Sequence, residues 1–210
     1  MFVKKIMIPK INCFTITNDT LIGEALDLMN LHNLDALPVL DGNHYVGTMT
    51  RYGIYERFFD TLVNREEFLS KTKVGDFSIL AMKVIKEDEL FERSIFEFKD
   101  FPQLAVVNDQ NLFTGIITRH DVLEQFESAF GMNVPGVRIT LTSVETKGRL
   151  AKLAEISKSF NEQIISVVTF DETDKLVRRI VLKISKNDNL KKFLEKVESV
   201  GFRVLHVNED

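Results

Sequence analysis

The chain contains the same short motif twice, and this internal repeat constrains its fold more than any other feature of the sequence. Residues 47–53 read GTMTRYG and residues 115–121 read GIITRHD, so the two copies are offset by 68 positions (115 − 47 = 68). An apolar segment precedes each copy, at 36–40 and at 103–107. Because a repeated unit usually cannot bury its apolar face alone, we expect the two copies to pack as a pair.

Turns, caps and apolar spacing predict the order β-α-β-β-α within each copy. In the first copy, residues 18–20 (NDT) offer helix-capping side chains and residues 41–43 (DGN) are a hairpin turn signal. The expected strands and helices lie at 14–16, 21–29, 36–40, 45–50 and from 51 onward. The second copy repeats them, with a strand at 83–85, a capped helix after 87–89 and strands at 103–107 and 112–118.

A third unit follows the clearest break in the chain, residues 131–136 (GMNVPG), where Gly, Asn and Pro-Gly interrupt regular structure. Beyond it, alternating and helical apolar spacing predicts the order β-α-β-β-α-β, which is the ferredoxin-like order. The fold class is therefore mixed, α+β and α/β. The expected parts are repeat 1 at 1–60, a solvated connecting helix at 61–73, repeat 2 at 74–130, a linker at 131–136 and the third unit at 137–210.

Composition narrows the class of protein. Hydrophobic residues make up 44% and charged residues 28% of the chain, as in an ordinary soluble globular protein. No run of 18 apolar residues is present and the first residues do not read as a signal peptide, so we expect a cytoplasmic protein without a membrane span. The single cysteine, Cys13, excludes an intramolecular disulfide and is expected to be a buried strand residue.

Charge differs along the chain. Up to residue 135 there are 13 basic and 20 acidic residues, whereas from residue 136 there are 14 basic and 11 acidic residues. Neither part has the basic excess of a nucleic-acid-binding surface, so nucleic acid is not an expected partner. An anionic ligand would have to be held locally, by a few basic groups and backbone amides.

The second motif places a threonine and an aspartate where a strand passes directly into a helix. The N-terminus of a helix presents unpaired N–H groups and the positive end of the helix dipole, which together favour phosphate. Thr118 adds a hydroxyl, Arg119 a planar cation, and Asp121 a carboxylate that can accept hydrogen bonds from ribose hydroxyls. The same spacing is close to a capping box, in which Thr118 and Asp121 only stabilise the helix. Both interpretations stay open on the residues alone.

The two copies resemble a tandem of cystathionine-β-synthase-type (CBS) domains, often called a Bateman module. The resemblance rests on LPV at 37–39, LAV at 104–106 and the two Gly-x-x-Thr motifs, and only the second motif continues to Asp121. It covers about residues 1–130. It implies that an adenosine nucleotide, such as AMP, ADP, ATP or S-adenosylmethionine, binds as a regulatory ligand in a cleft between the repeats.

The resemblance also implies which residues form the sites. The second repeat would bind phosphate and ribose through Thr118, Arg119, His120 and Asp121, and the base through backbone at Met82, Lys83, Val84, Leu104, Ala105 and Val106. A weaker first site would use Thr50, Arg51, Phe14, Leu37 and Pro38. Gly53 stands there in place of the family's aspartate, which puts the first site in doubt.

The third unit resembles an ACT domain over about residues 137–210, through Glu145-x-x-Gly148 followed by an apolar helix. This resemblance implies small effectors, often amino acids, at an interface between paired ACT units. The candidate effector loop is Glu145, Thr146, Lys147 and Gly148. The alternative is a purely structural, pairing role. Two CBS repeats followed by an ACT unit resemble the acetoin utilization family of small regulatory proteins.

The residue pattern shows no catalytic constellation. The four histidines lack metal-ligand spacing, and nucleophile-elbow, P-loop and dinucleotide motifs are missing. We therefore expect a protein that is not an enzyme and requires no metal or cofactor. The resemblance implies a regulatory sensor that acts on a regulated protein, and the apolar faces left by the repeat pair and by the third unit predict a homodimer. A ligand-free adaptor, favoured by Gly53, is the second hypothesis. A nucleic-acid-binding regulator is the third, and the charge balance disfavours it.

Overall fold

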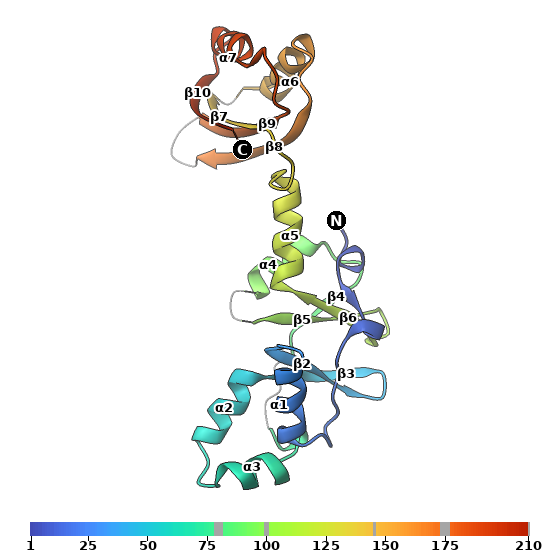
Figure 1. The fold of residues 1–210 in the computed structure, drawn as a ribbon. Helices are drawn as coiled ribbons and strands as arrows, with labels where there is room; N and C mark the ends of the chain where they lie inside the picture. Colours follow the sequence, from blue (N-terminus) through green and yellow to red (C-terminus); the bar gives the residue numbers. More distant parts are fainter. Residues whose placement is uncertain (78–81, 99–100, 145, 173–176, 210) are drawn as a thin grey trace. The chain divides into compact units, whose positions relative to one another are not determined.

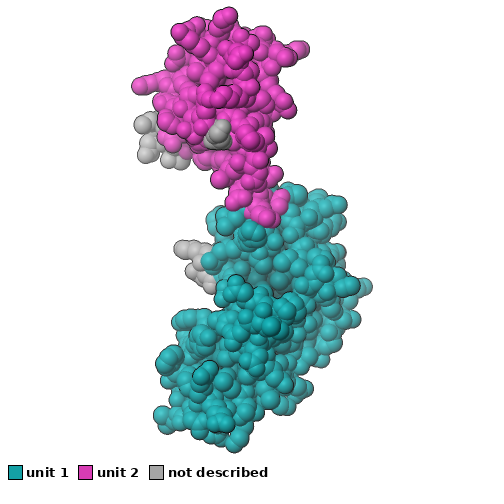
Figure 2. Space-filling view, in the orientation of Figure 1, with its two compact units in different colours: residues 1–123 teal, residues 124–210 magenta. Residues whose placement is uncertain are grey.

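The computed structural model describes residues 1–77, 82–98, 101–144, 146–172 and 177–209 (Figure 1). The chain divides into two compact units, residues 1–123 and 124–210, which Figure 2 colours separately. We call them the first and second units. Within the described residues, every helix is too short or too polar to cross a membrane.

The first copy of the repeat packs helices against a two-stranded hairpin. Strands β2 (Ala36–Asp41) and β3 (His44–Thr50) pair antiparallel around the turn that residues 41–43 predict. The helices are α1 (Ile22–Leu31), α2 (Arg51–Phe59) and α3 (Arg65–Lys71). Hairpin and helices share one buried apolar cluster, formed by Ile16, Ile22, Ala25, Met29, Leu37, Val39, Met49, Ile54, Phe68 and Val74.

The strand expected at 14–16 does not form. Only Ile16 pairs, through a single parallel bridge to Val39. The chain turns directly afterwards, because the N–H of Thr17 donates to the hydroxyl of Thr20 at 3.0 Å. Cys13 is accordingly a half-buried loop residue and not a buried strand residue.

Two helix predictions in the first copy also need correction. None of residues 18–20 caps α1, since the N-cap is Leu21, whose N–H donates to the Glu24 carboxylate at 3.0 Å. The segment 61–73 contains α3, which is not simply solvated because Phe68 is only 3% exposed. This phenylalanine fixes α3 to the core that α1 and α2 share.

The second copy forms a four-stranded sheet in the order β1-β6-β5-β4. Its strands are β1 (Ile8–Pro9), β4 (Val84–Lys86), β5 (Gln103–Val107) and β6 (Phe113–Thr118), and helix α5 (Arg119–Ala129) follows β6. The strand β4 runs parallel to β5, whereas β6 is antiparallel to both β5 and β1. Short 3-10 turns connect the elements of the first unit: η1 (Val3–Lys5), η2 (Lys10–Asn12), η3 (Val74–Asp76) and η4 (Phe91–Arg93).

The helix expected after 87–89 is much shorter than its counterpart α1. It consists of η4 and the four-residue helix α4 (Ser94–Glu97). The buried hydroxyl of Ser94 donates to the carbonyl of Phe91 at 2.5 Å, which holds the start of this segment in a tight turn. A buried serine that bonds the preceding turn is a common local competitor of regular helix.

The two copies pack together, as the repeat predicts. A bridge joins His44 to Leu112, and the N–H of Phe113 donates to the carbonyl of Asn43 at 2.9 Å. The facing sheets bury an apolar cluster between them, formed by Leu40, Tyr45, Ala105, Val107, Phe113 and Ile116. The end of each hairpin therefore lies against the other copy.

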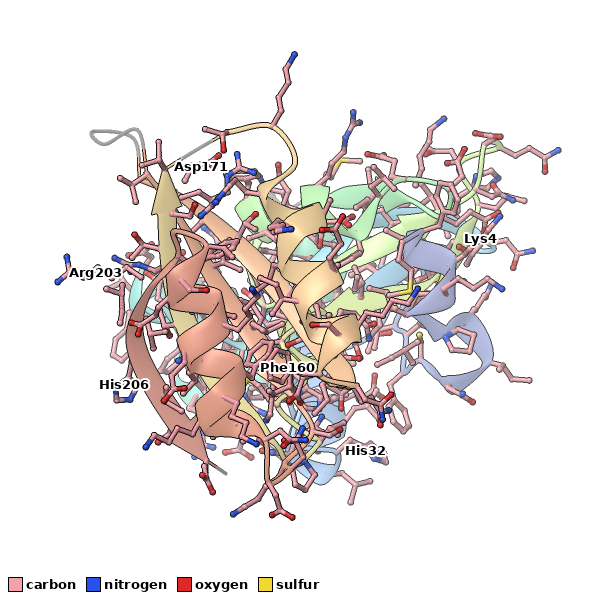
Figure 3. All side chains as sticks on the ribbon, turned by 90° about the horizontal axis from the view of Figure 1, so that it is seen from above. Lys4, His32, Phe160, Asp171, Arg203 and His206 are labelled. Atoms are coloured by element: carbon pink, nitrogen blue, oxygen red, sulfur yellow. The ribbon has the colours of Figure 1, made fainter. Side chains whose placement is uncertain are left out.

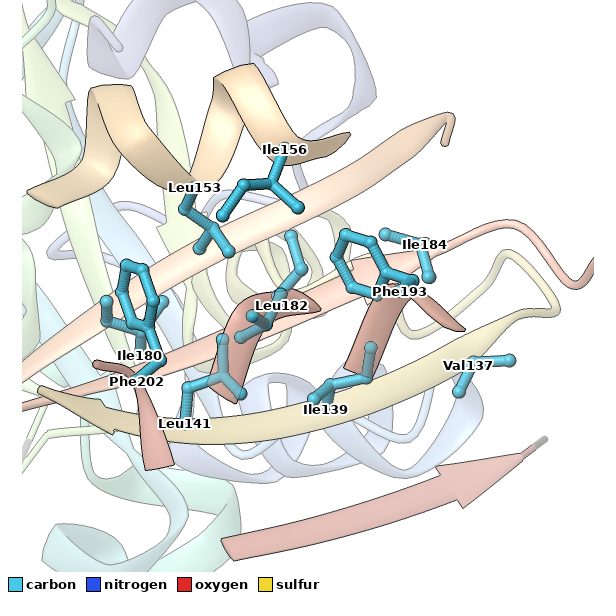
Figure 4. Close-up of a cluster of buried hydrophobic side chains, with 11 residues drawn as sticks. Val137, Ile139, Leu141, Leu153, Ile156, Ile180, Leu182, Ile184, Phe193 and Phe202 are labelled. Carbon is cyan, nitrogen blue, oxygen red and sulfur yellow. The ribbon is translucent and has the colours of Figure 1, made fainter. Parts of the chain in front are cut away.

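The second unit has the predicted order β-α-β-β-α-β. Its elements are β7 (Val137–Val144), α6 (Arg149–Ser159), β8 (Ile164–Glu172), β9 (Val177–Ile184), α7 (Leu190–Ser199) and β10 (Arg203–Glu209). The sheet order is β10-β7-β9-β8, with every neighbouring pair antiparallel. Figure 4 shows its core, in which Leu153 and Ile156 of α6 and Phe193 of α7 lie over β7 and β9.

Alternation along β7 explains this core. Val137, Ile139 and Leu141 are fully buried, whereas the residues between them are half-buried. Phe160, at the end of α6, packs edge-on against Phe193 with ring centroids 5.9 Å apart. At the edge of the sheet, Arg203 and His206 extend outward from β10 (Figure 3).

Candidate functional site

The strand β6 passes into helix α5 at Thr118, and Asp121 folds back onto that threonine. The Asp121 atom Oδ2 accepts the backbone N–H of Thr118 at 2.7 Å and the Thr118 hydroxyl at 2.6 Å. The N–H of Asp121 donates to the same hydroxyl oxygen at 3.3 Å. The capping interpretation of this spacing is therefore confirmed.

Capping leaves one oxygen of the Asp121 carboxylate available to a ligand. Both bonds to the Asp121 carboxylate end on Oδ2, and within the described ranges Oδ1 accepts no hydrogen bond. Thr118 and Asp121 are half-buried at the start of an 11-residue helix. The free oxygen and the positive end of the helix dipole thus lie side by side, and a ligand with hydroxyl and anionic groups can use both.

The backbone segments expected around the base lie at the same end of the sheet. Val84 is the register partner of Ala105, and the N–H of Ala105 donates to the Lys83 carbonyl at 3.1 Å. Across β5, Gln103 is the register partner of Thr118. The parallel and antiparallel pairings together bring residues 82–84, the start of β5 and the Thr118 junction to one edge.

Side-chain exposure differs sharply among these backbone segments. Leu104, Ala105 and Val106 are at most 1% exposed, so only their backbone can face a ligand. Met82 and Val84 are 69% and 47% exposed. The Lys83 ammonium pairs with the Glu97 carboxylate at 2.5 Å.

Arg119 and His120 occupy the first turn of α5, and both are exposed. The guanidinium of Arg119 donates from Nε to the carbonyl of Phe98 at 3.0 Å and from Nη2 to that of Phe101 at 3.4 Å. Arg119 therefore ties the helix to the segment that precedes β5. This engagement was not foreseen from the sequence.

The first copy has half of the same arrangement. The Thr50 hydroxyl accepts the N–H of Gly53 at 3.0 Å, but no carboxylate answers it at that position. Arg51 donates to the Leu34 carbonyl at 2.8 Å and to the Asn30 side chain at 2.6 Å. Leu37 is fully buried in β2.

Phe14 lies away from the backbone ladder. Its ring stacks on that of His32, with centroids 3.8 Å apart and planes 23° apart. His32 is labelled in Figure 3. Phe14 remains 42% exposed, so an accessible aromatic face is present on the segment before Ile16.

A cavity of about 410 Å³ lies where the first motif meets the second copy. Thr50 and Arg51 line it together with residues that sequence reasoning missed: Asp35, Tyr52, Tyr55, Phe101 and Pro102. Tyr52 follows the motif arginine directly, which was the available signal. The contribution of Phe101 and Pro102 arises only because the two copies pack together.

The loop between β7 and α6 lines a separate cavity of about 410 Å³ within the second unit. Thr146, Lys147 and Gly148 of the predicted effector loop line it, as do Arg149 and Arg178, whereas Glu145 lies outside the described residues. Gly148 has φ +82°, a left-handed conformation that favours glycine.

Arg149, beside that cavity, joins the start of α6 to the end of β7 and to the segment after α7. It donates to the Ser143 hydroxyl at 2.6 Å and to the carbonyls of Val200 and Gly201 at 3.0 Å and 2.7 Å. Its guanidinium also lies 4.0 Å from the centre of the Phe202 ring.

The described segments contain no candidate metal site, since no three His, Cys, Asp or Glu side chains are grouped there so that they could hold a metal ion.

Comparison with known proteins also finds two copies of one domain in this chain. The family model for the CBS domain matches residues 3–60 and 74–128. A CBS domain-containing protein of unknown function from Bacillus anthracis has a similar structure, with a TM-score of 0.55, 24% identity, and coverage of 60% of this chain and 93% of that one. CBSX2, solved in complex with AMP, matches with a TM-score of 0.50, 29% identity, and coverage of 60% and 95%.

A curated relative is also similar. Inosine-5'-monophosphate dehydrogenase from Methanocaldococcus jannaschii is 24% identical over 199 residues, which cover 91% of this chain. The chain spans only 35% of the length of that dehydrogenase. Because the two CBS matches together cover more than half of the chain, the protein belongs to the CBS-domain family.

Proposed function

We propose that the CBS pair is a regulatory sensor that binds an adenosine nucleotide at the junction of β6 and α5. The observation that carries this proposal is the geometry of Thr118 and Asp121, since the cap occupies one carboxylate oxygen and leaves Oδ1 for a ribose hydroxyl. The phosphate would lie at the N-terminus of α5, where N–H groups and the helix dipole favour negative charge.

The surrounding residues fit roles around that nucleotide. The backbone of residues 82–84 and the first residues of β5 would hold the base, since they lie at the same edge of the sheet as Thr118. His120, on the first turn of the helix, would lie beside the phosphate. Arg119 would fix the junction through the Phe98 and Phe101 carbonyls.

The class of ligand is supported by the family and by the AMP complex of CBSX2, which is 29% identical to this chain. AMP, ADP, ATP and S-adenosylmethionine share the adenosine group that such a site would recognise. The first copy, with Gly53 in place of an aspartate, would bind more weakly in the cavity lined by Thr50 and Arg51. In this proposal the nucleotide is a signal and not a substrate.

We further propose that the second unit acts as an ACT-type effector module. Its β-α-β-β-α-β order and the cavity at Thr146, Lys147 and Gly148 support this role. Lys147, Arg149 and Arg178 at that cavity would suit the carboxylate of an amino acid. A link to acetoin utilization is proposed on the domain order alone.

A homodimer is proposed from the exposed apolar side chains of the first copy. Tyr52 and Phe59 of α2 are 72% and 83% exposed, and Leu62 is fully exposed just beyond it. A neighbouring cavity of about 430 Å³ between α1, α2 and α3 is lined by Leu26, Phe58 and Phe68 among others. Symmetric pairing of two such faces would remove this apolar surface from water.

Calorimetry with AMP, ADP, ATP and S-adenosylmethionine tests the nucleotide proposal. We expect saturable binding of at least one of them with one strong site per chain. Ligand at 100 times its dissociation constant should then stabilise the fold by about 2.7 kcal/mol. If none of the four binds, the complete cap at Thr118 is purely structural, and the ligand-free adaptor becomes the better description.

A further inference from the structure

Gln103 is a buried polar residue whose role the fold does not explain. Its side chain is 6% exposed, and its amide nitrogen Nε2 has no hydrogen-bond partner among the residues that the structure describes. A buried amide donor without an acceptor is costly, so such groups are uncommon in folded proteins. The position therefore needs a reason beyond packing.

The place of Gln103 in the sheet supplies the reason. It is the first residue of β5 and the register partner of Thr118, so the two side chains are on the same face of the sheet. Directly opposed residues in an antiparallel pair are about 4.5 to 5.5 Å apart at their Cβ atoms. The Gln103 side chain thus begins beside that of Thr118, whose hydroxyl begins the proposed nucleotide site.

That face is the one turned toward the first copy. Ala105 and Ile116 are the next register partners on the same side, and both belong to the apolar cluster buried between the copies. Gln103 is therefore a polar group at the end of an otherwise apolar interface. Leucine or valine would satisfy packing there without an unpartnered donor.

The first copy offers an internal comparison. Ala36 is the first residue of β2 and the register partner of Thr50, so it occupies the place of Gln103. Ala36 is buried at 3% exposure and carries no polar side-chain atom. The amide, like Asp121, is thus present only in the copy that has the complete Thr-x-x-Asp motif.

We propose that the Gln103 amide is a specificity-determining donor of the nucleotide site, bonding an oxygen of the ligand's ribose-phosphate group. This inference rests on the proposed function. An NH₂ group recognises an acceptor, and its neighbour Thr118 is at the ribose-phosphate part of the site. The ligand would then complete the hydrogen bonding of Gln103, which the protein chain leaves incomplete.

The test compares wild type with Gln103→Leu and Gln103→Glu in the full chain, by calorimetry with AMP and with adenosine. Gln103→Leu keeps the size of the side chain and removes the donor, so we expect roughly a 3- to 10-fold weaker affinity for AMP. Gln103→Glu replaces the donor with a negative acceptor, and we expect a larger loss for AMP than Gln103→Leu shows. A loss with both ligands assigns the acceptor to ribose, and a loss with AMP alone assigns it to phosphate.

Thr48→Val is the matched control. Thr48 is 2% exposed, and its hydroxyl already bonds the Tyr45 hydroxyl at 2.8 Å. Without nucleotide, Thr48→Val should lower the denaturation midpoint, whereas Gln103→Leu should leave it unchanged or raise it. Thr48→Val should bind AMP like wild type.

Three results would overturn the inference. If Gln103→Leu retains wild-type affinity for both ligands, Gln103 has no role in binding. If Thr48→Val and Gln103→Leu weaken AMP binding equally, the effect is one of general packing. If wild type binds neither AMP nor adenosine but binds ADP, ATP or S-adenosylmethionine, the comparison is run with that ligand; if it binds none of them, the proposed function itself is wrong, and the inference about Gln103 is wrong with it.

Discussion

Nη2 of Arg119 donates to the main-chain carbonyl of Phe101 at 3.4 Å. The equivalent bond in the first copy joins Arg51 to the Leu34 carbonyl at 2.8 Å. Each arginine is the first residue of its helix, and each acceptor is two residues before its strand, β5 or β2. The arginine of the repeated motif therefore fixes the strand-to-helix junction in both copies.

This equivalence predicts the effect of replacing the guanidinium of either arginine with a lysine ammonium. Arg119→Lys and Arg51→Lys keep the charge but cannot reach two acceptors with planar geometry. We expect each to lower the free energy of unfolding by about 1 kcal/mol, measured by urea denaturation. An exposed control, Arg57→Lys on α2, should be neutral. Equal stability of all three variants would show that the carbonyl contacts contribute nothing.

Asp121→Ala separates capping from ligand binding. Loss of the two bonds to Thr118 should lower stability by about 1 kcal/mol without nucleotide. If Asp121 also binds ribose, the variant should lose most of the stabilisation that nucleotide gives to wild type. Thermal melts with and without AMP measure both effects. Equal destabilisation in the two conditions would reduce Asp121 to a cap.

Gly53→Asp rebuilds the missing half of the first motif. A Cβ on Gly53 would meet only the Thr50 hydroxyl oxygen within 4 Å, at 3.1 Å, so the side chain fits if that hydroxyl shifts by a few tenths of an ångström. Replacing a helical glycine and completing the cap should stabilise the protein by about 1 to 2 kcal/mol. The variant should also bind nucleotide more strongly in the first copy, giving two sites per chain by calorimetry. Gly53→Ala is the control, because it gains helix propensity but not the carboxylate.

Cys13 should be a slow nucleophile. Burial raises the pKa of its thiol from an ordinary 9.0 to about 11, and its sulfur donates weakly to the carbonyls of Ile8 and Pro9. At pH 8, alkylation of the folded protein should be roughly 100-fold slower than alkylation of the unfolded chain, since the thiolate is the reactive form. Iodoacetamide labelling followed by mass spectrometry checks this. Equal rates in buffer and in denaturant would contradict it.

Glu162 predicts a pH dependence of stability. Its carboxyl is 8% exposed and its pKa is raised by burial, although Asn187 donates a hydrogen bond to it. The folded state binds the carboxyl proton of Glu162 more tightly than the unfolded state does. The contribution of the protonated carboxyl to the free energy of unfolding is therefore complete below the unfolded pKa and is lost as pH rises through the folded pKa. Glu162→Gln should therefore equal wild type near pH 4 and exceed it at pH 7, measured by urea denaturation. An advantage that does not change with pH would show that ionisation is not involved.

The sequence predicts the frame of the fold because local signals and long-range pairing agree. The turn at 41–43 and the alternation along β7 are written in adjacent residues, and both appear in the structure. The strand expected at 14–16 fails because its pairing depends on where residues 17–20 turn. The helix after 87–89 begins as the 3-10 turn η4, which the Ser94 hydroxyl bonds through the Phe91 carbonyl, and α4 itself spans only Ser94–Glu97.

The candidate site was only partly readable from the sequence. Spacing alone identified Thr118 and Asp121, since a capping box and a phosphate site share the same local geometry. Gln103 and the cavity residue Phe101 were not identified, because each acquires its role from pairing or packing with a distant segment. Burial of a polar side chain can be recognised only once the partner strands are known.

The pairing of β1 with β6 has a practical consequence for dissecting the protein. Ile8 and Pro9 lie opposite Ile116 and Gly115, and a Cβ on Gly115 would lie only 2.2 Å from the Ile8 carbonyl oxygen. The first residues of the chain thus complete the sheet of the second copy, so a fragment cut at residue 74 would lack an outer strand and expose the β6 edge to self-association. A soluble version of the isolated second copy should therefore carry residues 1–13 fused to it through a linker.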